Sequence, residues 1–196
     1  MKSNFRILVA VAAVAAAFGA APVLADSSTA TTTSGAPLAY RAPAQVDFRI
    51  VIPAFVYFQV GSATAGTIDT VTFSPTTADL GTANVIPGSQ TLNVVLRGNN
   101  GAITIAQTNG GNLVEAGGVE TISFATISTA TSDPNLPAPV LSAVSTNTGA
   151  LPVTAGKVTN RSAVWTYSYT NAAIPSAGTY GAFGNSGRVT YTAVMP

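Results

Sequence analysis

The chain has 196 residues, of which 47% are apolar and only 8% are charged, whereas an ordinary soluble domain carries about 25% charged residues. It contains neither histidine nor cysteine. These absences exclude a Ser-His-Asp triad, thiol catalysis, disulfide bonds and any imidazole or thiolate metal site. We therefore expect no enzymatic activity and no cofactor, with an oxygen-only calcium site left open.

The first 25 residues have the pattern of a secretory signal peptide. Lys2 and Arg6 precede an apolar run over residues 7–21, and Val23 and Ala25 are the small residues that a signal peptidase selects. Cleavage after Ala25 removes two of the 8 basic residues and none of the 7 acidic ones, so the net charge becomes −1. We expect an exported protein without a basic patch for nucleic acid and without a membrane span in its mature part.

The mature chain begins with a polar stretch and continues as strands and turns. Residues 26–44 are rich in Thr, Ser and Ala and predict a flexible tail. From residue 45, apolar residues alternate with mostly polar ones, which predicts a first strand with one buried face. The apolar positions of this strand are Val46, Phe48, Ile50 and Ile52. Further strands are predicted over residues 55–60, 68–74, 120–127, 140–144, 163–170 and 187–194.

The clearest local signal lies between residues 91 and 107. Two alternating segments flank the sequence Gly-Asn-Asn-Gly at residues 98–101, whose residues tolerate the positive φ of a tight turn. The pattern predicts a hairpin with one shared apolar face. The side chains expected to be buried together are Leu92, Val94, Leu96, Ile103 and Ile105.

Together these elements predict an all-β chain. Short strands separated by turn signals at intervals of about 8 to 12 residues are typical of an antiparallel sandwich or a small barrel, and no mature segment sustains apolar residues at helical spacing. We predict one antiparallel β-sandwich over residues 45–196, of immunoglobulin-like or related Greek-key topology.

Two groups of side chains could carry chemistry. Trp165, Tyr167 and Tyr169 share a strand face; exposed, they would form an aromatic platform for sugar rings, and buried, they would form the core, which is the interpretation we favour. Glu115 and Glu120 are the only pair of glutamates. A carboxylate pair can hydrolyse glycosides, but their place beside a glycine turn favours two solvated side chains.

Both ends of the predicted domain resemble those of bacterial surface and fimbrial subunits. Residues 47–53 open the domain, and residues 175–180, with Gly-Thr-Tyr at their end, lead into a last strand that holds Tyr191. In chaperone–usher pilins this resemblance would imply an incomplete sandwich that is completed by a strand of the next subunit. The chain lacks the cysteine pair that many such pilins carry, and residues 26–44 lack the bulky alternating residues of a donor strand.

The function expected from these observations is that of an exported, non-enzymatic structural or adhesive protein of a bacterial surface, of which a fimbrial subunit is one form. It would reside in the periplasm, on the cell surface or outside the cell, with itself or other surface subunits as partners. The candidate assembly strands contain Val46, Phe48, Ile50 and Ile52 near the start and Val189, Tyr191 and Ala193 at the end. The alternative is a monomeric secreted module that binds a glycan or another ligand.

Overall fold

The computed structural model describes residues 28–31 and 41–196, except residues 143 and 182. The expected signal peptide and much of the expected tail lie outside these residues. The chain divides into two units between Val51 and Ile52. In the first unit, residues 41–51 are exposed and belong to no strand. The second unit carries the strands, and no helix among the described residues is long and apolar enough to cross a membrane.

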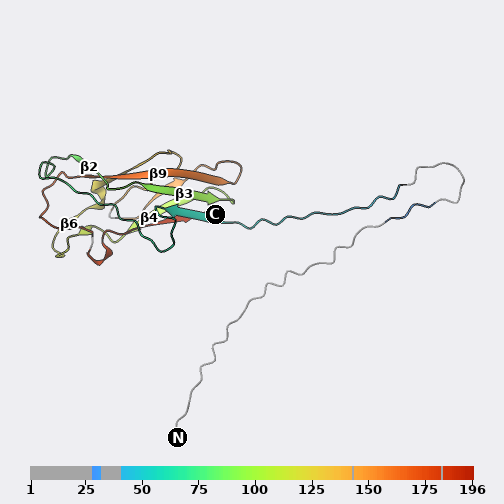
Figure 1. Cartoon of the computed structure of the whole chain (residues 1–196), viewed down its shortest axis with the longest axis horizontal. Helices are drawn as coiled ribbons and strands as arrows, with labels where there is room; N and C mark the ends of the chain where they lie inside the picture. The colour runs from blue at the N-terminus through green and yellow to red at the C-terminus, as the bar shows by residue number, and fades with distance from the viewer. Residues whose placement is uncertain (1–27, 32–40, 143, 182) are drawn as a thin grey trace, which may run out of the picture. The chain divides into compact units, whose positions relative to one another are not determined.

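The second unit is an all-β sandwich, which confirms the predicted fold class; 36% of the chain is strand and 3% is helix. The larger sheet is built on the long strand β9 (Figure 1). Its five strands are β1 (Val56–Val60), β2 (Val85–Pro87), β3 (Leu92–Gly98), β7 (Ile127–Thr131) and β9 (Thr159–Thr170). Tyr169 pairs with both Ile86 of β2 and Ile127 of β7, so these two strands lie on opposite edges of β9.

The second sheet has three strands in the order β10-β4-β8. They are β4 (Thr104–Asn109), β8 (Thr146–Ala150) and β10 (Val189–Val194). A small ladder joins β5 (Leu113–Val114) to β6 (Thr121–Ile122), and two single-turn 3-10 helices, Phe124–Thr126 and Phe183–Asn185, lie in the connections. Every ladder is antiparallel.

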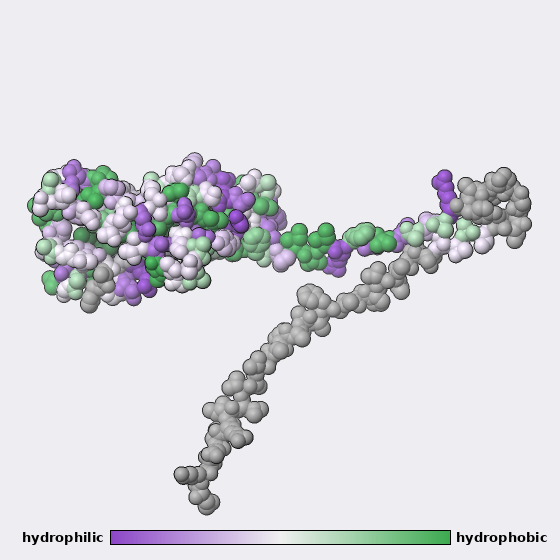
Figure 2. All heavy atoms as spheres, viewed as in Figure 1, coloured by the Kyte–Doolittle hydropathy of each residue, from purple (hydrophilic) through white to green (hydrophobic). Residues whose placement is uncertain are grey.

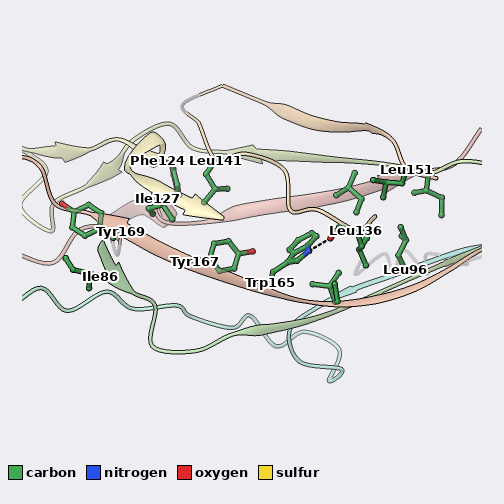
Figure 3. Close-up of a cluster of buried hydrophobic side chains, with 14 residues drawn as sticks. Ile86, Leu96, Phe124, Ile127, Leu136, Leu141, Leu151, Trp165, Tyr167 and Tyr169 are labelled. Atoms are coloured by element: carbon green, nitrogen blue, oxygen red, sulfur yellow. Dashed lines mark hydrogen bonds between the residues drawn. The ribbon is translucent and has the colours of Figure 1, made fainter. Parts of the chain in front are cut away.

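The core is formed where the inward faces of the two sheets meet. One apolar cluster contains fully buried side chains from both sheets: Val94 and Leu96 of β3, Ile105 of β4, and Ile103, which directly precedes β4. The cluster also holds Trp165 (Figure 3). A side chain at Gly98 would place its Cβ 2.9 Å from Cδ1 of Ile103, closer than real contacts allow. Glycine therefore permits the close approach of β3 to the other sheet at this end.

The outer surface of the sandwich reflects the scarcity of charge. Figure 2 shows it mostly in pale shades, which correspond to residues of intermediate hydropathy, with few strongly hydrophilic positions. Among the described residues one ion pair is formed, between Arg161 and Asp133 at 3.5 Å. The fold therefore depends on apolar packing and on hydrogen bonds rather than on paired charges.

In residues 91–107 the side chains predicted to face the core do so, but the two strands do not pair with each other as predicted. The side chains expected to be buried are buried, with Leu92 only partly so. However, β3 pairs with β1 and β9, whereas β4 pairs with β10 and β8. The turn at residues 98–101 thus crosses from one sheet to the other and does not close a hairpin. Alternation identifies the buried face of a strand, but it does not identify the strand's neighbours.

Three predicted strands are absent from the structure. Residues 45–52 are not paired in any ladder, and residues 68–74 have no strand either; of the predicted strand 140–144, the described residues 140–142 and 144 are not in a strand. In residues 68–74 the alternation of apolar residues still predicts which side chains pack inward, because Val71 and Phe73 contact the core. Between them, the backbone N–H of Thr72 donates to the Ser89 hydroxyl at 3.0 Å. An irregular segment can thus bury alternate side chains without joining a sheet.

Candidate assembly site at an open strand edge

The last strand of the chain, β10, has one paired edge. All six of its residues are in register with β4, and no described strand pairs with the opposite edge. Val189, Tyr191 and Ala193 point toward the core, yet each is only partly buried. The core therefore remains incompletely covered along β10.

The larger sheet ends on the same side of the molecule. Its edge strand β1 pairs only with β3, and β1 and β10 are in contact. The inward residues Phe58 and Val60 of β1 are partly buried, as are their counterparts in β10. The open edges of both sheets thus adjoin one another.

Strand order shows what is absent there. In a constant-type immunoglobulin domain, one sheet holds the first, second, fifth and fourth strands in that order, and the other holds the third, sixth and seventh. Here β1, β3, β9 and β7 are ordered as in the first sheet, and β4 pairs with β10 as the third strand pairs with the sixth. The strands β2, beside β9, and β8, beside β4, have no counterpart in that pattern. The described residues contain no seventh strand beside β10.

The side chains behind the open edge are aromatic and hydrogen-bonded. The rings of Tyr191 and Trp165 meet edge-on with centroids 5.3 Å apart, and the hydroxyls of Tyr191 and Tyr167 lie 3.1 Å from each other. Burial raises the pKa of both tyrosines above the ordinary value, more strongly for Tyr191. These hydroxyls therefore stay neutral and serve as an internal polar link between the sheets.

The aromatic stripe considered for sugar binding lies in the interior. Trp165 is fully buried, and Tyr167 and Tyr169 are 8% and 9% exposed. The indole N–H of Trp165 donates to the carbonyl of Leu136 at 2.9 Å (Figure 3), and the Tyr169 hydroxyl donates to Oδ1 of Asn171 at 2.8 Å. None of these rings presents a face to solvent, so the stripe is core and not a platform.

The residues predicted as the first assembly strand include the two most exposed large apolar side chains of the described residues, Phe48 and Ile50. Phe48 is 92% exposed and Ile50 is 86% exposed, with Val46 and Ile52 at 64% and 75%. Figure 2 shows the stretch that precedes the sandwich alternating between hydrophobic and hydrophilic residues. This part of the chain thus carries the pattern of a half-buried strand without a partner.

Two asparagines hold the beginning and the end of the second unit at one turn. Asn99 donates to the carbonyl of Pro53 at 2.8 Å and accepts from the N–H of Phe55 at 2.9 Å. Its neighbour Asn100 donates to the carbonyl of Pro196 at 3.0 Å. Sequence reasoning treated both asparagines only as turn residues. Their amides also fix where the chain enters β1 and where it leaves β10.

The glutamate pair has a structural role in the described residues. Glu120 accepts hydrogen bonds from the hydroxyl of Ser176 at 2.6 Å, from its N–H at 3.0 Å and from the hydroxyl of Tyr180 at 3.1 Å. These bonds, first among them that from the Ser176 hydroxyl, hold the pKa of Glu120 below its usual value. Within the described ranges, no group of three acidic side chains is placed to hold a metal ion.

Comparison with known proteins gives no further guide to the family. No family model, no curated protein and no solved structure matches the chain. The open edge of β10 and the exposed segment before the sandwich are the features of the chain that point to a function.

Proposed function

We propose that the protein is an exported structural subunit of a bacterial surface assembly, in which residues 45–52 of one copy add as a strand to the open edge of β10 in the next. This proposal is based on two complementary features of the same chain, an unpaired strand edge and an unpaired strand-like segment. One sheet lacks a strand beside β10, and one strand-like apolar segment lacks a sheet. Strand addition to an exposed edge supplies main-chain hydrogen bonds and places alternate side chains in the partner's core.

The two elements match in length and chemistry. β10 offers six residues for pairing, and the segment of eight residues is long enough to span them at about 3.4 Å per residue. Val46, Phe48, Ile50 and Ile52 would face the partly buried side of β10, and the intervening residues Asp47, Arg49 and Val51 would face solvent. We therefore favour residues 45–52 as the donor over residues 26–44, which lack bulky alternating side chains.

The test compares two substitutions that introduce the same charge on opposite faces of the segment. Ile50→Asp would place a carboxylate in the partner's core, which is strongly unfavourable, whereas Val51→Asp would place it in solvent. We expect size-exclusion chromatography and electron microscopy to show multimers for the unaltered protein and for Val51→Asp, and a folded monomer for Ile50→Asp. Deletion of residues 26–44 should leave the multimers intact.

Other outcomes would count against strand donation. Multimers that survive Ile50→Asp would contradict it, and so would an unaltered protein that remains monomeric at every concentration. A monomer whose residues 45–52 become protected from hydrogen exchange would show that the segment pairs with β10 of its own chain. Unfolding by Ile50→Asp would indicate that the segment belongs to the core of its own domain.

A further inference from the structure

The outer face of the larger sheet carries a shallow hollow that is distinct from the edge of β10. It has a volume of about 400 Å³ and is lined by Phe55, Tyr57, Gln59, Val95 and Arg97. Tyr57 pairs with Arg97 and Gln59 pairs with Val95 across β1 and β3, so these four side chains form two rows on one face. The inward residues of the same strands belong to the core.

One aromatic ring that lines this hollow, that of Tyr57, is held in place. The Tyr57 hydroxyl donates to Oε1 of Gln59 at 2.7 Å, and Nε2 of Gln59 donates to the carbonyl of Gly61 at 2.9 Å. A tyrosine that reaches the residue two positions ahead must lie along its strand. Tyr57 and Phe55 are still 45% and 49% exposed. The hollow thus contains an ordered, accessible aromatic surface.

Arg97 gives the hollow its charge. No acidic residue lines it, and the only ion pair among the described residues belongs to another arginine. A guanidinium presents a planar set of donors that matches a carboxylate. The aromatic face beside it carries partial negative charge and attracts the weakly positive C–H groups of a ligand.

From this arrangement we infer that the hollow binds an acidic sugar, with the C–H face of the ring on Tyr57 and the carboxylate on Arg97. Its volume falls in the range of small-ligand sites. A protein partner would require an interface of about 20 to 30 residues on each side. On β9, however, the residues that pair with Arg97 and Val95 are the small polar residues Asn160 and Ser162, so the aromatic surface does not continue across that strand. This site does not depend on strand donation.

The experiment is a ligand-observed NMR titration of the full chain, which tolerates multimers. The probes are a disaccharide of galacturonic acid and the neutral galactose disaccharide of the same linkage. We expect saturable binding of the acidic disaccharide, with a Kd of about 1 mM. Tyr57→Ala should weaken it about tenfold or more, and Arg97→Gln should reduce it to the affinity of the neutral sugar.

Two matched variants distinguish binding at this site from a general effect of lost charge or of a smaller apolar side chain. Arg188→Gln removes a similar exposed arginine elsewhere and should leave the affinity unchanged. Tyr57→Leu keeps an apolar side chain without an aromatic face and should bind as weakly as Tyr57→Ala. Absence of saturable binding up to about 20 mM, or equal losses for the two arginine variants, would overturn the assignment. Full binding by Tyr57→Leu would overturn it as well.

Discussion

Truncating Leu96 tests whether β3 has the correct face in the core. Leu96→Ala removes three carbon atoms from a side chain that is fully buried, and at about 0.8 kcal/mol per methylene the lost transfer free energy is about 2.4 kcal/mol. The surrounding cluster includes Ile103 and Trp165, which are also fully buried and come from both sides of the core. Because such walls collapse little, the remaining cavity raises the expected loss to about 3 to 5 kcal/mol.

The matched control is the residue that directly precedes Leu96 on the same strand, Val95. Val95 points to the outer face and is partly exposed, so Val95→Ala should cost less than about 1 kcal/mol. Both values follow from urea titrations, in which a shift of the midpoint at constant slope measures the free energy of unfolding. A larger loss for Val95→Ala than for Leu96→Ala would mean that β3 is displaced by one residue, because such a slip exchanges the two faces.

Two further changes test the polar groups of the core. Trp165→Phe removes the indole N–H that donates to the buried carbonyl of Leu136, which keeps the Thr131 hydroxyl as a second donor at 3.0 Å. The loss of this one hydrogen bond should cost about 0.5 to 1.5 kcal/mol in addition to the lost contact area. Circular dichroism during urea unfolding measures it, and a total loss below about 0.5 kcal/mol would contradict the hydrogen bond. Burial raises the pKa of Tyr167 and Tyr191, whereas in the unfolded chain these hydroxyls ionise at their ordinary pKa of about 10. The folded state therefore keeps its full stability below about pH 10 and loses stability as the pH rises further. Urea midpoints between about pH 8 and pH 11.5 should fall accordingly, and less steeply for Tyr191→Phe; a flat profile would refute this account.

The sequence alone allows the inward faces of most strands to be predicted, because side-chain direction alternates strictly along a strand. Leu96 and Ile105 were placed correctly for this reason. Their assignment to different sheets depends on β1, β8, β9 and β10, which lie far away in the sequence. Local alternation carries no information about such partners.

For the candidate sites, prediction from the sequence is limited in a different way. Alternation over residues 45–52 predicts a first strand with one buried apolar face, but it does not indicate whether the same chain or a neighbouring copy covers that face. Within its own chain Ile50 is 86% exposed. The hollow around Tyr57 was missed because this residue lies in a segment that is apolar on both faces, where composition cannot distinguish an outward aromatic residue from a buried one. The pairing of Tyr57 with Arg97 is a property of the sheet register.

The hydrogen bonds of Asn99 have a mechanical consequence. A pull on the chain before residue 53 first reaches the sandwich where Asn99 holds Pro53 and Phe55, and next reaches β1, whose five residue pairs with β3 begin at Val56. Ladder hydrogen bonds are perpendicular to the strands, so a force along β1 loads all of them in shear together and does not open them one at a time. A pull along β1 is thus resisted by all five residue pairs of this ladder at once.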